Sequence, residues 1–410
     1  MSTFEKNLEK YAELVVRIGN NVQKGQTLLV HAPIETIGFV RKIAEKAYEA
    51  GAKHVYFDWE DDVIKRTKFE LAPDEAFHEY PEWKAKWFEE LAENGATFLN
   101  IRTPNPDLLT GIDSKKISAA NKAEAQAIAD YKDARMKDKV SWCVISAATK
   151  EWALKVFPDL PEDEALEKLW ETIFKMTRVD REDPVAAWSE HQSALNEKVN
   201  YLNEKKFRKL HYTAPGTDLT IELPEGHLWV GGAGPNEDGV DFFANIPTEE
   251  VFTMPLKTGA NGKVTNTKPF NYHGSLIDGF TLTFENGRIV ECQAETGEEI
   301  LENLIDTDEG SHYLGEMALV PYDSPISQSG LIFYNTLYDE NASCHLAIGK
   351  AYPSTLEGGS KMSAEQLKDR GANNSLVHED FMIGSADLDI DGITDNGETV
   401  PLFRNGNWVI

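Results

Sequence analysis

The sequence predicts an α/β N-terminal domain with a mostly parallel sheet, followed by a mostly antiparallel α+β C-terminal domain. In the first half, short apolar runs alternate four times with amphipathic stretches, at spacings typical of a parallel sheet covered by helices. After about residue 206 glycine becomes dense, helical patterns thin out, and alternating apolar and polar residues appear. This change places a boundary near residue 205, between domains spanning residues 1–205 and 206–410.

The first half supports this fold class element by element. Ser2 and Glu5 form a capping-box pattern that opens an amphipathic helix, and Gly51 ends a second helix. Strands are predicted over residues 27–32, 54–57, 97–99 and 140–145. Further helices are predicted through Trp83, Trp87 and Leu91, over residues 118–132, and within the helical stretch from about 150 to 205.

The second half is predicted to consist mainly of strands. Residues 219–223 alternate apolar and polar side chains, as a half-buried strand does. The runs 279–284 and 288–292 flank Asn286-Gly287, which predicts a hairpin with a tight turn. One helix is predicted near residues 295–305.

Charge and cysteine content limit the classes of partner and compartment. The chain has 69 Asp and Glu against 41 Lys and Arg, a formal net charge of −28, so we expect no nucleic-acid and no membrane partner. No apolar run approaches the roughly 18 residues that span a membrane, and the start lacks the apolar stretch of a signal peptide. Three widely spaced cysteines argue against a disulfide framework. These observations predict a soluble, reduced, cytoplasmic protein.

Two segments match ligand-loop patterns but lack the required context. Residues 387–398 fit the calcium-loop pattern DxDxDG-x5-E, yet strands or turns rather than helices are predicted on both sides. We interpret Asp391-Gly392 and Asn396-Gly397 as hairpin-turn residues. The glycine-rich residues 231–234 lack the Gly-Lys-Ser/Thr ending of a phosphate loop and are interpreted as a flexible loop.

A histidine and an aspartate in the second half suggest a metal site. On a strand, His378 and Asp380 lie two residues apart and point to the same face, whereas Glu379 points away. An imidazole and a carboxylate that converge beside an apolar run suit a divalent ion such as zinc, cobalt or manganese. The alternative is a surface strand with ordinary polar residues.

Three more side chains could extend this site. His345 begins a run of small and apolar residues, which favours burial, although a satisfied core histidine would show the same pattern. Glu250 precedes the apolar pair Val251-Phe252, and Glu316 lies within an apolar run. A buried carboxylate is costly unless a cation, an arginine or a shared proton accompanies it.

Several ordered blocks of the sequence resemble a known family. The blocks are Asn245–Glu250, Gly315-Glu316, Asp339–His345, Tyr352 and His378–Gly384, together with the opening helix and residues 401–408. They resemble the thermophilic-type metallo-aminopeptidases of bacteria, the aminopeptidase T and aminopeptidase S group, over essentially the whole chain. The resemblance implies a homodimer with an internal active-site chamber, which removes single residues from peptides with a free N-terminus.

The resemblance also implies the composition of the site in the C-terminal domain. Two adjacent divalent ions per subunit (zinc, cobalt, manganese or magnesium) would activate a water molecule. Glu250 resembles a ligand of one ion, and Glu316 the carboxylate that bridges both. The remaining ligands would be His345, His378 and Asp380, with Glu340 as a further candidate. Tyr352 matches the family's catalytic tyrosine, whose hydroxyl is expected to face the scissile carbonyl.

A non-catalytic divalent-metal or peptide-binding protein of the same fold is the competing hypothesis. Such a protein would keep the ligands but would turn nothing over. Tyr352 favours the enzyme, because a storage site has no need of a hydroxyl group that can stabilise a developing oxyanion.

Overall fold

The computed structural model describes residues 2–272 and 275–410, and the chain divides into two compact units. The first comprises Met1–Ser189 and Ala233–Ile246, and the second Glu190–Gly232 and Pro247–Ile410. The division therefore differs from a single boundary near residue 205. The chain returns to the first unit because the Val144 amide donates to the Ala244 carbonyl and the Ile246 amide donates to the Val144 carbonyl, at the edge of the sheet of this unit.

The first unit contains the predicted parallel sheet. Its strands are β1 (Thr27–Pro33), β2 (His54–Glu60), β3 (Thr97–Arg102) and β4 (Trp142–Ser146). They have the order β2-β1-β3-β4, and every neighbouring pair is parallel. A short hairpin of β7 (Ala233–Pro235) and β8 (Asp241–Phe243) lies in the returning segment. The four strands predicted in the first half are thus confirmed.

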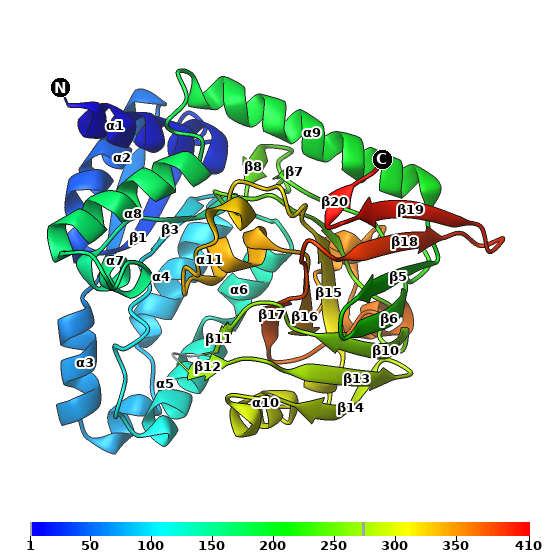
Figure 1. The fold of residues 1–410 in the computed structure, drawn as a ribbon. Coiled ribbons are helices and arrows are strands. Elements are labelled where there is room, and N and C mark those ends of the chain that lie inside the picture. Colours follow the sequence, from blue (N-terminus) through cyan, green and yellow to red (C-terminus); the bar gives the residue numbers. More distant parts are fainter. Residues whose placement is uncertain (1, 273–274) are drawn as a thin grey trace. The chain divides into compact units, whose positions relative to one another are not determined.

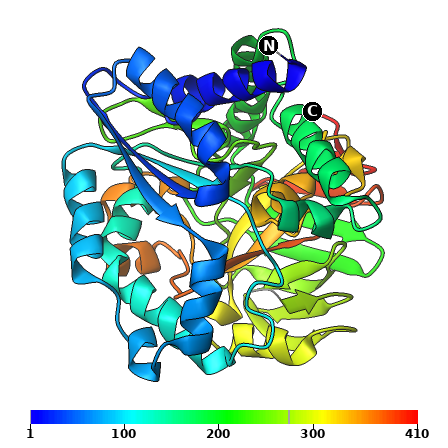
Figure 2. The same ribbon diagram turned by 90° about the vertical axis from the view of Figure 1, so that its left-hand side faces the viewer.

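Helices cover the parallel sheet (Figures 1 and 2). The helices of this unit are α1 (Thr3–Leu14), α2 (Ile37–Glu49), α3 (Asp62–Leu71), α4 (Glu82–Glu93), α5 (Ser114–Ala127), α6 (Ala129–Met136), α7 (Lys150–Val156), α8 (Glu162–Met176) and the start of α9 (Pro184–Lys205), most of which belongs to the second unit. Ser2 caps α1 as predicted, by accepting a hydrogen bond from the Glu5 amide. The single helix predicted over 118–132 is in fact two, because the chain breaks at Ile128. Helix α3 was not predicted, since Phe69 is its only buried side chain and no apolar stripe marks it.

Four ionisable side chains meet near the carboxyl ends of β1 and β2. His31 Nδ1 lies 2.7 Å from Asp58 Oδ2, His31 Nε2 lies 3.4 Å from Glu60 Oε1, and Lys84 Nζ lies 2.8 Å from Asp58 Oδ1. Burial alone would lower the pKa of His31, but the two carboxylates outweigh it and raise this pKa from 6.5 to about 9. His31 is therefore charged at neutral pH, and the cluster ties α4 to the first two strands.

We expect His31→Gln to destabilise the first unit in a pH-dependent way. Because the folded-state pKa of His31 is raised, its stabilising contribution is fully present below pH 6.5 and is lost as the pH rises through about 9. The free energy of unfolding should fall by on the order of 2 kcal/mol at pH 6 and by much less at pH 10. Urea unfolding of parent and variant at both pH values tests this, and a pH-independent difference would contradict it.

The second unit is built mainly from antiparallel strands. These are β5 (Lys209–Ala214), β6 (Thr217–Glu222), β9 (Val251–Thr253), β10 (Ala260–Thr265), β11 (Phe270–Tyr272), β12 (Ser275–Ile277), β13 (Thr281–Glu285), β14 (Arg288–Gln293), β15 (Leu314–Leu319), β16 (His345–Gly349), β17 (His378–Met382), β18 (Asp389–Ile393), β19 (Thr399–Arg404) and β20 (Asn407–Trp408). Helices α10 (Glu298–Ile305), α11 (Thr336–Asp339) and α12 (Ala364–Asp369) connect them. The predicted contrast between a parallel first part and a mostly antiparallel second part is confirmed.

Two of these sheets form the framework of the unit. The larger has the order β14-β13-β10-β6-β5-β18-β19-β20, and the smaller the order β17-β16-β15-β9. Apolar side chains of both sheets share a buried core, to which β5 contributes Leu210 and Tyr212 and β16 contributes Leu346 and Ile348. One face of the smaller sheet is therefore committed to the core.

Two turn predictions in this unit can be compared with the structure. The β13–β14 hairpin has Asn286 and Gly287 at φ angles of 51° and 83°, the left-handed conformation that a two-residue turn requires. The calcium-loop segment contains β18 and the turn that leads to β19, with which β18 pairs in antiparallel fashion, and strands rather than helices lie there, as expected. Asp391 and Gly392 lie within β18, however, so their interpretation as turn residues was wrong. The left-handed Gly397 lies between the two strands instead.

Among the residues that the structure describes, no helix is both long enough and apolar enough to cross a membrane.

Candidate metal centre

The candidate site lies on the sheet β17-β16-β15-β9 of the second unit. It occupies the face of this sheet that is turned away from the shared core. Strand β16 is buried along its whole length, and its Leu346 and Ile348 point into that core. Because side chains alternate along a strand, His345 and Ala347 point to the opposite face. We call this opposite face the polar face.

The register of the sheet brings the predicted residues together on the polar face. Glu316 of β15 lies opposite Ala347, and Ala347 lies opposite Asp380 of β17, so all three side chains point the same way. His378 precedes Asp380 by two residues and shares its face, whereas Glu379 between them points to the other side. Three strands thus contribute four of the five side chains that define the cluster.

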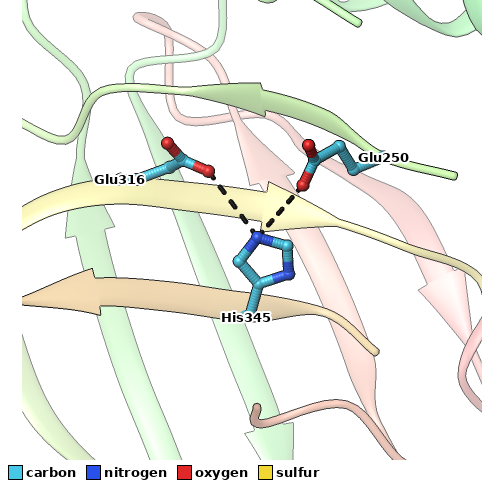
Figure 3. A group of neighbouring side chains, drawn as sticks. All are labelled: Glu250, Glu316 and His345. Carbon is cyan, nitrogen blue, oxygen red and sulfur yellow. Dashed lines mark ion pairs between the residues drawn. The ribbon is translucent and has the colours of Figure 1, made fainter. Parts of the chain in front are cut away.

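Glu250 and Glu316 converge on the same nitrogen of His345 (Figure 3). The Nε2 atom of His345 lies 3.1 Å from Glu250 Oε2 and 3.6 Å from Glu316 Oε1. Glu250 belongs to the segment just before β9, and Glu316 and His345 come from neighbouring strands. All three side chains are buried. Their donor atoms lie close enough together for a single metal ion to contact all of them.

Glu316 belongs to a second group as well. Its other oxygen, Oε2, lies 3.6 Å from His378 Nε2, which in turn is 3.8 Å from Asp380 Oδ1. The same Asp380 oxygen lies 4.0 Å from His345 Nε2. Glu316, His378 and Asp380 therefore form a second set of closely spaced donors, and Glu316 is the carboxylate common to both sets.

Backbone carbonyls fix the orientation of both imidazoles. His345 Nδ1 lies 3.0 Å from the carbonyl oxygen of Ser343, and His378 Nδ1 lies 2.6 Å from that of Lys350. A carbonyl only accepts, so Nδ1 must donate its proton in each ring. Each Nε2 is then the ligand atom directed at the carboxylates, an arrangement typical of metal-binding histidines.

The charges of the cluster are not satisfied by the protein alone. Glu250 Oε2 and Asp380 Oδ1 are buried, and apart from the imidazole nitrogens at 3.1–4.0 Å neither has a hydrogen-bond partner among the residues that the structure describes. Burial raises the pKa of Glu316 to about 7. Burial would lower the pKa of His345, but Glu250 and Glu316 outweigh it and raise this pKa well above its usual value. Without a metal ion, protons must take the place of the missing positive charge.

The two remaining predicted residues lie at the border of the cluster. Burial, followed by the negative charges of Asp380 and Glu250, raises the pKa of the half-buried Glu340 well above its usual value. Glu340 is not part of either group of closely spaced donors. The ring of Tyr352 meets that of His378 edge to face, with centroids 4.9 Å apart. Burial and the nearby carboxylates raise the pKa of the Tyr352 hydroxyl well above its usual value, so it can act as a donor.

Two residues that shape the site lie in the blocks that carry the family resemblance, but sequence analysis gave them no role. Asn341 is fully buried; its Oδ1 accepts from the Glu249 amide at 2.7 Å, and its Nδ2 lies 3.4 Å from Glu340 Oε1. It thereby links the segment of Glu250 to that of Glu340. Gly315 is the extra residue of a β-bulge immediately before Glu316, where a side chain would collide with the backbone after β16. The glycine beside Glu316 was the available signal for Gly315, whereas Asn341 lies among other polar residues and no local pattern marks it.

Comparison with known proteins agrees with the fold and gives the family of the chain. Residues 4–408 match the family described as thermophilic metalloprotease, M29. The chain is 58% identical over 408 residues to aminopeptidase 2 of Geobacillus stearothermophilus, which covers 100% of this chain and 99% of the relative. It is 57% identical to aminopeptidase AmpS of Bacillus subtilis, with both chains covered completely. The solved structure of wild-type AmpT from Thermus thermophilus has 44% sequence identity, a TM-score of 0.94 and complete coverage of both chains.

Proposed function

The chain belongs to the M29 family of thermophilic metalloproteases and is a metal-dependent aminopeptidase, and we propose that two divalent ions held by the cluster serve its hydrolysis. In this proposal Glu250 and His345 hold one ion, His378 and Asp380 the other, and Glu316 bridges both. Glu340 is a further candidate ligand at the border of the site. The substrates are peptides with a free N-terminus.

The main support for the proposal is that Glu316 belongs to both groups of closely spaced donors. Its two oxygens face the Nε2 atoms of two different imidazoles at equal distances of 3.6 Å. The surrounding carboxylates, those of Glu250, Glu316, Glu340 and Asp380, carry four negative charges when ionised, which two divalent cations would balance. Neutral imidazoles and ionised carboxylates are also the ligand types that divalent ions such as zinc, cobalt and manganese accept.

The chemistry proposed for the site divides between the metal ions and the protein. Bound metal ions would supply a water molecule of lowered pKa and would polarise the scissile carbonyl. Tyr352 would donate a hydrogen bond to the oxyanion that develops on that carbonyl, and would later help to protonate the leaving amine. A carboxylate that holds no metal ion, such as Glu340 at the border of the cluster, would anchor the free amine of the substrate.

The identity of the metal ions, the oligomeric state and the cellular location follow from the family resemblance and are part of the proposal. We infer that zinc, cobalt, manganese or magnesium can occupy the two positions. We also infer a homodimer that acts in the cytoplasm. These points can be tested by metal analysis and by the molar mass of the protein in solution.

Hydrolysis of aminoacyl-4-nitroanilides tests the proposed activity directly. We expect turnover that a chelator abolishes and that added cobalt or zinc restores. Full metal occupancy without turnover of leucyl, alanyl or phenylalanyl substrates would instead support the non-catalytic metal-binding alternative.

We expect Asn341→Ala to weaken metal binding, although Asn341 contacts no metal ion in this proposal. Its side chain fixes the backbone of Glu249 and lies beside Glu340, so its loss frees the segments that carry two of the carboxylates. Changes to residues that orient ligands typically cost about 10–100-fold in metal affinity. Titration of the metal-free protein with zinc, followed by calorimetry, measures this directly.

Asn266→Ala is a matched control for Asn341→Ala. Asn266 is also buried in the second unit; it accepts from the Phe280 amide at 2.6 Å and donates to the Lys268 carbonyl at 2.8 Å. Both variants should lower the thermal stability, but only Asn341→Ala should lower the zinc affinity. Equal zinc affinities in the two variants would contradict a positioning role for Asn341.

A further inference from the structure

We propose that Phe252 determines specificity by packing against the side chain of the substrate's first residue, and that this side chain is aliphatic or aromatic. The inference rests on the proposed aminopeptidase function and extends it to the class of substrate. The evidence for it is the register of the sheet β17-β16-β15-β9 and a row of aromatic contacts.

The register places Phe252 on the same face as the metal cluster. Phe252 of β9 lies opposite Ala318 of β15, and Ala318 lies opposite His345 of β16. Side chains opposite one another in an antiparallel sheet share a face, so the Phe252 ring lies on the polar face. Neighbouring strands are about 4.8 Å apart, which puts the backbone of Phe252 about 10 Å from that of His345. Within this row, only the methyl group of Ala318 separates them.

Aromatic contacts link Phe252 to the reacting end of the site. The ring of Phe252 lies 6.0 Å from that of Tyr352 at an interplanar angle of 66°, and Tyr352 lies 4.9 Å from the ring of His378 at 73°. Both contacts are of the edge-to-face type that aromatic pairs prefer. The three rings form a row that runs from the cluster to Phe252.

This row determines where the first residue of a peptide would lie. The scissile carbonyl belongs to that residue, so its side chain begins one bond away from the carbonyl carbon. If the hydroxyl of Tyr352 faces the carbonyl oxygen, the side chain lies beside Tyr352 and within reach of Phe252. Phe252 is half-buried, unlike the fully buried Phe333 and Phe381 of the same unit, so part of its ring can be covered by a ligand.

The chemistry of the ring selects the class of side chain. A phenyl ring has no hydrogen-bonding group, so it stabilises a neighbour only by dispersion and by removal of apolar surface from water. Leucine and phenylalanine side chains gain from this contact, whereas the methyl group of alanine is too short to cover the ring. We therefore expect large apolar first residues to be preferred.

Phe252→Ala tests the proposal with the 4-nitroanilides of leucine, phenylalanine and alanine. We expect kcat/KM for the leucine and phenylalanine substrates to fall at least about tenfold more than for the alanine substrate. The metal content should stay at the parent level. Calorimetry with L-leucinol and L-alaninol, which cannot be hydrolysed, should show the same loss of preference at the level of binding.

Tyr201→Ala serves as a control, because it removes a half-buried ring of α9 that packs against the core of the same unit. It should leave the ratio of kcat/KM values unchanged. An equal loss for all three substrates in Phe252→Ala would show that Phe252 merely supports Tyr352, and would overturn the proposal. An unchanged ratio would overturn it as well. Were the parent inactive on every substrate, the proposed function would fail, and the leucinol and alaninol affinities would still decide the role of Phe252.

Discussion

Glu316→Gln is expected to abolish turnover, because a single substitution weakens both metal positions at once: one loses its ligand oxygen, and the other keeps only a neutral amide oxygen. Glutamine has the same size, but one carboxylate oxygen becomes an amide group that cannot bind a cation. Substitution of residues that only hydrogen-bond to metal ligands already costs about 10–100-fold in metal affinity or activity. For a direct ligand we therefore expect less than about 1% of the parent activity. Steady-state hydrolysis of leucyl-4-nitroanilide at saturating metal, with the metal content measured in parallel, gives the result.

Glu379→Gln provides the matched control for this experiment. Glu379 lies between His378 and Asp380 but points away from the polar face, so its substitution removes the same charge without removing a ligand. We expect activity within a few-fold of the parent. If Glu316→Gln also kept activity within a few-fold of the parent at saturating metal, Glu316 could not be the carboxylate shared by two ions.

Tyr352→Phe is expected to lower kcat by about 10²–10³ while both metal ions stay bound, because the hydroxyl is proposed as a donor and not as a ligand. The effect should fall mainly on kcat, since the hydrogen bond forms only as negative charge develops on the carbonyl oxygen. The ring contacts with His378 and Phe252 remain in the variant, so the fold should be unchanged. Metal analysis and steady-state kinetics of the same preparation separate the two effects.

Tyr313→Phe is the corresponding control, because it removes a hydroxyl group that lies 3.5 Å from Glu309 and is not part of the metal cluster. This variant should keep the parent kcat. Full metal occupancy of Tyr352→Phe with a nearly unchanged kcat would make Tyr352 a packing residue. The proton for the leaving amine would then have to come from another group.

Local patterns were enough to predict much of this architecture. In β16, small and apolar residues follow His345, and in β17 two polar residues at a spacing of two share one face. Such alternation depends on neighbouring residues alone, so it is visible in the sequence. The same holds for the β13–β14 hairpin, whose Asn286 and Gly287 adopt the positive φ angles that the turn requires. The sequence resemblance then brought these segments together as one site.

Properties that depend on distant contacts could not be predicted from local patterns. The register that aligns Glu316 with Asp380 depends on the bulge at Gly315 and on strands far apart in the chain. The return of residues 233–246 to the first unit depends on backbone bonds to Val144, which no side-chain pattern reveals. Helix α3 buries little more than Phe69, so it lacks the apolar stripe by which a helix is recognised.

The most direct test of two metal ions sharing Glu316 is an anomalous-scattering map from crystals of the zinc-loaded protein. We expect two peaks about 3.5–4 Å apart, the separation typical of co-catalytic pairs. One should lie beside Glu250 and His345, the other beside His378 and Asp380, with Glu316 between them. A single peak at full occupancy, or two peaks without Glu316 between them, would contradict the account.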